Sequence, residues 1–206
     1  MQVSLESDFS MASSARVESL STRPRRADAS RNYDKLIDAG LAAFTESGAE
    51  ASLESFARRA GVGIGTLYRH FPSRQALLEA VYIEEVESLC KSADDLTELP
   101  PWDALVGWLR RFVAYAATKR ALATELMASV GQDSEVFRKC HDAIYHAGEP
   151  LLERARESGA VRPDVDFTDV VRMVSGITMI RTASPEDIDR ILILALDGLR
   201  YRPPGK

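Results

Sequence analysis

The sequence lacks a long apolar run. No stretch of roughly 18 hydrophobic residues occurs in its 206 residues, so we expect no membrane-spanning helix and no membrane partner. The opening, MQVSLESDFSMASSARVESL, carries acidic residues and no apolar centre, unlike a secretory signal. Cysteine is scarce too: only Cys90 and Cys140 occur, and we expect both to be free thiols in a reducing compartment. These absences predict a cytoplasmic protein.

The signatures of common enzymes are also missing. The chain contains neither G-x-S-x-G nor H-E-x-x-H, and the glycines at 61, 63 and 65 follow no strand. His141 and His146 share a predicted helix, but a five-residue spacing places them about 140° apart around its axis. We therefore expect no catalytic residue, no metal site and no cofactor.

Positive charge is in deficit, with 26 basic against 31 acidic residues and a net charge of −5. The deficit is not uniform: residues 22–83 carry nine basic and seven acidic residues, and residues 84–206 carry sixteen and twenty-one. Four arginines cluster just before the first strong helical pattern: Arg23, Arg25, Arg26 and Arg31. This asymmetry predicts a small phosphate-facing module attached to an acidic body.

Period-2 patterns typical of strands are absent, and apolar residues recur at helical spacing from Tyr33 onward. The predicted fold class is all-α. Residues 1–29, rich in Ser, Ala and Arg, are expected to form a flexible basic arm. A three-helix helix-turn-helix domain at 30–75 would precede a larger helical domain at 76–206. The first helix would begin at an Asn32 cap and end at Gly48. Body helices are expected at 101–119, 120–130, 133–158, 166–181 and 185–201.

The stretch GVGIGTLYRHFPSRQALL, residues 61–78, predicts the second half of the helix-turn-helix. In a helix over residues 63–70, Leu67 and Phe71 would point inward because they are four residues apart. The outward side chains would then be Thr66, Tyr68, Arg69 and His70. Their hydroxyl, phenol, guanidinium and imidazole groups can reach phosphates and base edges in a major groove. Gly63 and Gly65, without Cβ atoms, would allow a close approach to DNA.

Residues 33–83 resemble the N-terminal DNA-binding domain of TetR-type transcriptional repressors. The most specific part is A-x-x-A-G-V-x-x-G-T-L-Y-x-H-F, residues 57–71. Ile64 stands where the family often has a polar residue, so we expect an apolar contact to a thymine methyl there. The resemblance implies contacts, mostly to the DNA backbone, from Ser52, Thr66, Tyr68, His70 and Arg74. The full predicted DNA-binding set is Ser52, Gly63, Ile64, Gly65, Thr66, Tyr68, Arg69, His70 and Arg74.

The later part of the chain is similar to the SbtR-like branch of this family, chiefly through PPWDALVGWLRRFVAYAATKR (100–120) and DGLR (197–200). The similarity implies an effector-binding and dimerisation domain. An ordinary packed core also explains the apolar stripes of this region, so both interpretations stand. The candidate ligand-binding residues are Trp102, Trp108, Phe112, Tyr115, Met127, Phe137, Tyr145, Met173 and Ile177.

Apolar residues cover more than half the circumference of the last predicted helix, which predicts a partner subunit over one side. The candidate dimer-interface residues are Val174, Ile188, Ile191, Leu192, Ala195 and Leu199.

Together these patterns predict a homodimeric repressor that binds a double-stranded, pseudo-palindromic DNA operator and is released by a small hydrophobic effector. Two alternatives remain at this point: an architectural DNA-binding protein without an effector, and a helical enzyme or lipid carrier.

Overall fold

The computed structural model describes residues 20, 23–24, 26–47, 52–131, 134–180 and 182–200, without the side chains of 45–47 and 117–121. All regular secondary structure in these residues is helical, which confirms the predicted all-α class. The helices are α1 (Ala27–Ser47), α2 (Leu53–Ala60), α3 (Ile64–His70), α4 (Arg74–Lys91), the 3-10 helix η2 (Asp94–Leu96), α5 (Pro101–Val130), α6 (Glu135–Glu157), α7 (Phe167–Thr178) and α8 (Pro185–Asp197). None of them is both long and apolar enough to cross a membrane.

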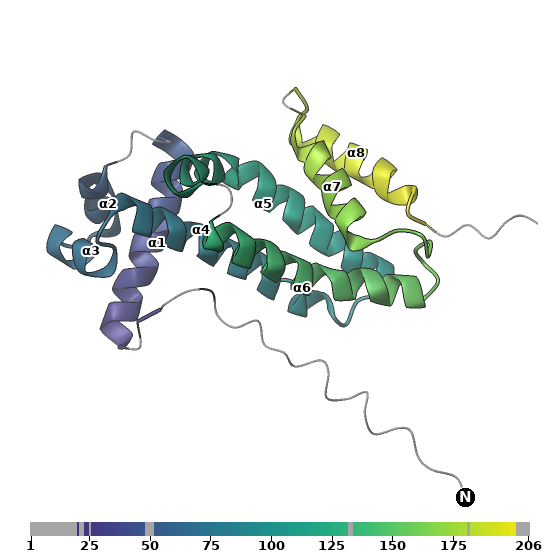
Figure 1. Cartoon of the computed structure of the whole chain (residues 1–206), viewed down its shortest axis with the longest axis horizontal. Coiled ribbons are helices and arrows are strands. Elements are labelled where there is room, and N and C mark those ends of the chain that lie inside the picture. Colours follow the sequence, from purple (N-terminus) through teal and green to yellow (C-terminus); the bar gives the residue numbers. More distant parts are fainter. Residues whose placement is uncertain are drawn as a thin grey trace, which may run out of the picture.

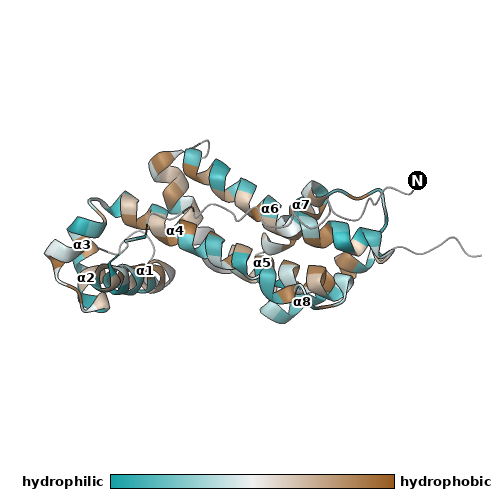
Figure 2. Cartoon of the chain, turned by 90° about the horizontal axis from the view of Figure 1, so that it is seen from below, coloured by the Kyte–Doolittle hydropathy of each residue, from teal (hydrophilic) through white to brown (hydrophobic). Residues whose placement is uncertain are grey.

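The molecule is elongated, with α1, α2 and α3 at one end and α7 and α8 toward the other (Figures 1 and 2). We call α1–α3 the head and α5–α8 the body. Helix α4 belongs to both, since it contacts α1 in the head and α5 and α6 in the body. One continuous set of buried side chains extends from Phe56 and Leu67 through Leu77 to Trp108.

Helices α2 and α4 begin after serine caps and α2 ends at a glycine, residue types that commonly mark helix ends in a sequence. The Ser52 hydroxyl accepts a hydrogen bond from the Ser55 N–H at 3.2 Å, which caps α2. Gly61 ends α2 in the left-handed conformation, with φ of 63°, that glycine adopts without strain. The Ser73 hydroxyl accepts from the Ala76 N–H at 3.1 Å and caps α4.

Helix α1 begins earlier than expected. Its first residue is Ala27, so Asn32 lies inside the helix and is not its cap. Asp28 in the first turn is favoured by the helix dipole and pairs with Arg31, which explains why the helix extends in this direction. Residues 27–29 are therefore helical and not part of an arm. The predicted helix end at Gly48 and most of the predicted arm, including Arg25, lie outside the described residues.

Helix α5 is a single helix, so the predicted break between residues 119 and 120 is wrong. The sequence from Trp102 to Val130 contains no proline and a single glycine, Gly107. Nothing in it therefore interrupts a helix. The helix ends at Gly131, whose N–H donates to the Met127 carbonyl. Helices α7 and α8 end three and four residues before the predicted bounds, at Thr178 and Asp197.

Both cysteines are free and buried, Cys90 on α4 and Cys140 on α6. Burial disfavours the thiolate, and it raises the pKa of Cys90 to about 11 and that of Cys140 to about 12. Thiols in such a setting are packing groups and poor nucleophiles at neutral pH.

Candidate DNA interface and effector region

Helix α3 presents one face to solvent and the other to the head's core. Leu67 is completely buried and Phe71 nearly so, as the four-residue spacing predicts. On the opposite face, the exposed fractions of Ile64 and Tyr68 are 41% and 46%. Arg69 is exposed beside them. Ile64 and Tyr68 are also four residues apart, so they form a continuous outward stripe.

Two of the predicted DNA-binding side chains are only partly outside. Thr66 and His70 are half-buried. The His70 ring packs edge-on against Tyr33 of α1, with the ring centroids 6.3 Å apart, and Tyr33 also contacts Phe71 at 5.3 Å. His70 therefore helps to anchor α3 on α1, in addition to any contact with DNA.

The glycines of α3 leave open space. A Cβ on Gly63 or Gly65 would meet no atom of the chain within 4 Å. Packing within the chain therefore does not require glycine at either position. The close approach of DNA to this backbone stays a prediction.

Arg74 lies apart from the outward stripe of α3. Its guanidinium pairs with Glu125 of α5 and lies over the Phe44 ring, 5.1 Å from the ring centroid. Ser52, the other predicted contact outside α3, is exposed, but its hydroxyl already accepts the capping bond from Ser55. Arg74 thus joins the start of α4 to the body, a role that sequence reasoning missed.

In the body, four of the predicted ligand-binding residues belong to one aromatic cluster, which we define as Trp108, Phe112, Tyr115, Tyr145 and Phe167. Trp108 contacts Phe112 at 5.9 Å and Phe167 at 6.0 Å between ring centroids. Phe112 contacts Tyr115 at 6.3 Å, and Tyr145 meets Phe167 edge-on at 5.3 Å. Phe167, the first residue of α7, is the member that the sequence analysis missed.

The aromatic cluster is tightly packed around Trp108, which is completely buried. The indole N–H donates to the Leu89 carbonyl of α4 at 3.3 Å. Gly148 of α6 lies directly against the rings: a Cβ there would be 2.2 Å from Phe167 Cζ and 2.6 Å from the Trp108 ring. Only glycine permits this approach of α6 to α5 and α7.

Helix α4 also reaches the aromatic cluster through tyrosine. A hydrogen bond joins the hydroxyls of Tyr82 on α4 and Tyr115 on α5. Burial, the largest cause, raises the pKa of both phenols, so both are neutral over the physiological range. Phe137 of α6 packs edge-on against Tyr82 at 5.2 Å. The α4–α5–α6 junction is thus aromatic, with one buried polar pair.

The remaining predicted ligand-binding residues lie elsewhere or only nearby. Trp102 stacks with the Arg200 guanidinium, 4.4 Å from the ring centroid. Met127 is exposed near the end of α5. On α7, Met173 is half-buried and Ile177 is buried. Trp102 and Met127 therefore do not join the aromatic cluster.

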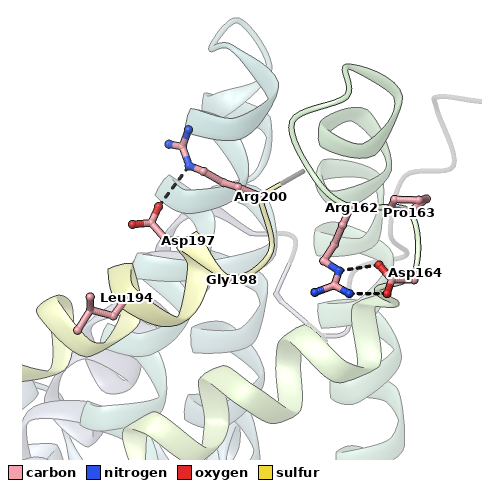
Figure 3. A pocket seen from close by; sticks show the side chains of 7 residues that line it. All are labelled: Arg162, Pro163, Asp164, Leu194, Asp197, Gly198 and Arg200. Atoms are coloured by element: carbon pink, nitrogen blue, oxygen red, sulfur yellow. Dashed lines mark hydrogen bonds and ion pairs between the residues drawn. The ribbon is translucent and has the colours of Figure 1, made fainter. Parts of the chain in front are cut away.

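Two hollows of the described surface are lined by other residues. One, of about 590 Å³, lies between the turn after α6 and the end of α8; it is lined by the ion pairs Arg162–Asp164 and Arg200–Asp197 and by Leu194 of α8 (Figure 3). The second, of about 540 Å³, lies between α1 and α4. Both are rich in charge, unlike the site expected for a hydrophobic effector. Nowhere in the described residues do three His, Cys, Asp or Glu side chains gather as metal ligands.

The predicted dimer residues divide into two groups. Val174 and Leu192 are completely buried within the single chain, and Leu199 is nearly so, so these side chains cannot meet a partner. That corrects their assignment. The other three, Ile188, Ile191 and Ala195, are half-buried. The large apolar side chains exposed on α8 and directly after α7 are Leu194 (67%), Met179 (63%) and Ile180 (39%).

Sequence models of two families match the chain: bacterial regulatory proteins of the tetR family at residues 36–81, and the C-terminal domain of SbtR-like transcriptional regulators at 100–201. The transcriptional repressor KstR of Mycolicibacterium smegmatis is 30% identical over 177 residues, which cover 79% of this chain and 83% of KstR. KstR of Rhodococcus jostii is 34% identical over 172 residues, 79% and 80% of the two chains.

Solved structures of TetR regulators are also similar to this chain in sequence and fold. A TetR transcriptional regulator from Streptomyces coelicolor is 41% identical, with a TM-score of 0.71 over 82% of this chain and 98% of that one. A second, from Mycobacterium vanbaalenii, is 30% identical with a TM-score of 0.69 over 86% and 100%. With a helix-turn-helix at one end and a helical body behind it, the chain belongs to the TetR family and is a DNA-binding regulator of transcription.

Proposed function

We propose that this regulator acts in the cytoplasm as a repressor, binds a pseudo-palindromic operator as a homodimer, and is released by a small hydrophobic effector. The observation that carries the proposal is the position of α4, which extends from the end of α3 to the aromatic cluster. Ser73 caps this helix three residues after α3 ends, and its later part contacts the aromatic cluster through Tyr82 and Leu89. One rigid element thus connects the DNA-facing helix to the region proposed for the effector. The two KstR relatives, both named repressors, support the sign of regulation.

The second subunit is proposed to cover α7 and α8 at the exposed apolar side chains of Leu194 on α8 and of Met179 and Ile180 directly after α7. These helices lie far from α3 along the molecule (Figures 1 and 2), so a contact there leaves both recognition helices free. Operator half-sites one DNA turn apart, about 34–36 Å, then set the separation that the two α3 helices must match.

The effector is proposed to enter beside the aromatic cluster, where Tyr115, Tyr145 and Phe137 are half-buried and the surroundings are mostly apolar. A ligand that wedges between α4 and α6 there would tilt α4 and change the separation of the two heads. An effector with a ~100-fold preference for the non-binding form supplies about 2.7 kcal/mol, enough to weaken operator binding to a similar degree.

Selection of bound duplexes from a random library tests the DNA part of the proposal. The expected product is a two-fold symmetric sequence, bound by a dimer in sedimentation analysis. Leu194→Arg should then yield monomers with much weaker operator binding, while Leu99→Arg, at an exposed leucine outside α7 and α8, should remain dimeric. Enrichment of no preferred sequence would favour an architectural DNA-binding protein.

A panel of small hydrophobic compounds tests the effector part. Compounds that raise the melting temperature should also release the selected duplex, and Ala116→Trp, beside Tyr115, should alter this response without changing the dimer. Compounds that bind the body tightly and never change operator affinity would refute ligand release.

A further inference from the structure

We propose that Arg23 is a positioning residue, which fastens the two helices that support the recognition helix, and that it is not a ligand of DNA phosphates. The inference rests on DNA binding by α3. It differs from the sequence-based expectation that Arg23 belongs to a flexible basic arm of a phosphate-facing module.

The side chain of Arg23 is held at both ends of its guanidinium. Nε donates to Glu84 Oε1 at 2.8 Å and Nη2 donates to Oε2 at 2.6 Å, a two-bond fork that fixes the geometry. Nη1 lies 3.4 Å from Asp34 Oδ1. Asp34 belongs to α1 and Glu84 to α4, so one cation bridges the head to the helix that leads into the body.

This bridge differs from an ordinary surface ion pair. Isolated exposed pairs contribute about 0–1 kcal/mol because water screens them. Only 10% of the Glu84 side chain is exposed, so its carboxylate has few other partners to replace the guanidinium. Loss of Arg23 would remove both charge-assisted hydrogen bonds from that carboxylate, which is costlier than loss of an exposed pair.

The bridge also reaches the recognition helix. The Arg23 guanidinium lies 6.0 Å from the centroid of the Tyr33 ring. Tyr33 is buried, and its ring contacts His70 and Phe71 at the end of α3. Tyr33 therefore links Arg23 to His70 and Phe71. A substitution of Arg23 that moves the Tyr33 ring would also change the orientation of α3.

The local charge argues against a phosphate at this place. Arg23 lies in the hollow between α1 and α4, which five carboxylates line against two cations. The charged lining residues are Arg23, Asp34, Asp38, Glu84, Glu85, Lys91 and Asp95. A DNA phosphate approaching Arg23 would meet this negative field, and Arg23 would have to leave Glu84 to bind it.

The experiment compares Arg23→Ala and Glu84→Gln with the matched control Arg26→Ala, at an exposed arginine three residues further on. For each variant, binding to the duplex selected by the wild-type chain and to a scrambled duplex is measured across a salt series. A positioning role predicts that Arg23→Ala and Glu84→Gln each reduce the ratio of specific to nonspecific affinity by about 3–10-fold, with the salt slope unchanged. The double variant should lose no more than either single one, and Arg23→Lys should recover part of the loss.

If Arg23 instead binds a DNA phosphate, the Glu84 substitution should not weaken DNA binding. Arg23→Ala would then flatten the slope of log affinity against log salt by about 0.9, and Glu84→Gln would leave binding unchanged or strengthen it. That result would overturn the inference, as would an effect of Arg26→Ala equal to that of Arg23→Ala.

A second readout requires no DNA. The chain has three histidines, so the His70 imidazole resonance can be followed directly by NMR. Arg23→Ala and Glu84→Gln should both shift it, and Arg26→Ala should not. An unshifted His70 resonance refutes the positioning role even if no operator is found, whereas failure to select any duplex refutes only the proposed operator.

Discussion

In the head, Ile64 and Tyr68 stand on the outer face of α3, and Leu67 between them is completely buried. In the body, the aromatic side chains face inward and contact one another, with Trp108 at the centre. The side chains of Ile64 and Tyr68 are thus separate from the core, whereas the body residues proposed to bind an effector pack directly against or within it. Substitutions in the head can therefore change binding alone, whereas substitutions in the aromatic cluster must also change stability.

The same residue type shows this contrast at two positions. A Cβ added to Gly65 of α3 would meet nothing within 4 Å, and one added to Gly148 of α6 would lie 2.2 Å from Phe167. An alanine at each position therefore separates two kinds of constraint, the first proposed to come from DNA outside the chain and the second set by packing inside it.

The largest effect is expected for Gly148→Ala. The new methyl group must displace the Trp108 and Phe167 rings, and overpacking of this kind costs about 1–3 kcal/mol or more. Urea unfolding should show the loss. Gly107→Ala on α5 is the control, because a Cβ there meets Leu96 at an ordinary 3.4 Å. Equal stability of the two variants would mean that α6 is not held against the rings as described.

A comparable effect, but on binding alone, is expected in the head. Tyr68→Ala and Thr66→Ala should each weaken operator binding by about 1–3 kcal/mol, because each removes a polar group from the DNA-facing helix. Fluorescence anisotropy with the selected duplex measures the loss, and circular dichroism verifies folding. Arg58→Ala, at an exposed residue of α2, should have a smaller effect. Unchanged affinity in both variants, with folding intact, would remove α3 from the interface.

How far the sequence predicts this structure differs between the same two regions. The caps at Ser52 and Ser73 and the turn at Gly61 depend on residues within one helical turn, so a local pattern is enough to locate them. The inward position of Leu67 and Phe71 follows from their spacing alone. The family resemblance rested on these local features, and the comparisons confirm it.

Contacts between distant residues could not be predicted in this way. Arg23 and Glu84 are 61 residues apart, and Arg74 and Glu125 are 51 apart. The orientation of helix α8 could not be predicted either. The helix is apolar on more than one side, and its sequence alone does not indicate which side packs on α7. The structure buries Leu192 and exposes Leu194, so the predicted dimer set includes a core residue and omits the most exposed apolar residue of α8.

A smaller effect is expected for Gly65→Ala, the counterpart of the α6 substitution. Alanine favours the helix, so stability should stay equal or rise by up to about 1 kcal/mol. Operator affinity should nevertheless fall by roughly tenfold, about 1.4 kcal/mol, if the α3 backbone approaches DNA closely. Unfolding and anisotropy on the same sample separate the two. Gain of stability without loss of affinity would show that the glycine faces no partner.

The smallest effect is expected where head and body meet, at Glu125→Gln. Glutamine keeps the shape of the side chain and removes its charge, so Arg74 loses the carboxylate that holds it toward α5. Because the pair is partly exposed, the stability cost should be at most about 1 kcal/mol. Operator affinity should rise about 2–5-fold, and the salt slope should steepen by about 0.9, as the guanidinium becomes available to a phosphate.

Two control variants test whether the gain in affinity comes from the Arg74 guanidinium. Glu135→Gln removes a carboxylate paired with Lys139 on the exposed surface of α6 and should change neither quantity. Arg74→Ala combined with Glu125→Gln should abolish the gain in affinity. If Glu125→Gln instead weakens binding at an unchanged slope, Arg74 serves to hold the head on α5. The resemblance-based assignment of Arg74 to the DNA backbone would then be wrong, and the recognition surface would reduce to α3 and the start of α2.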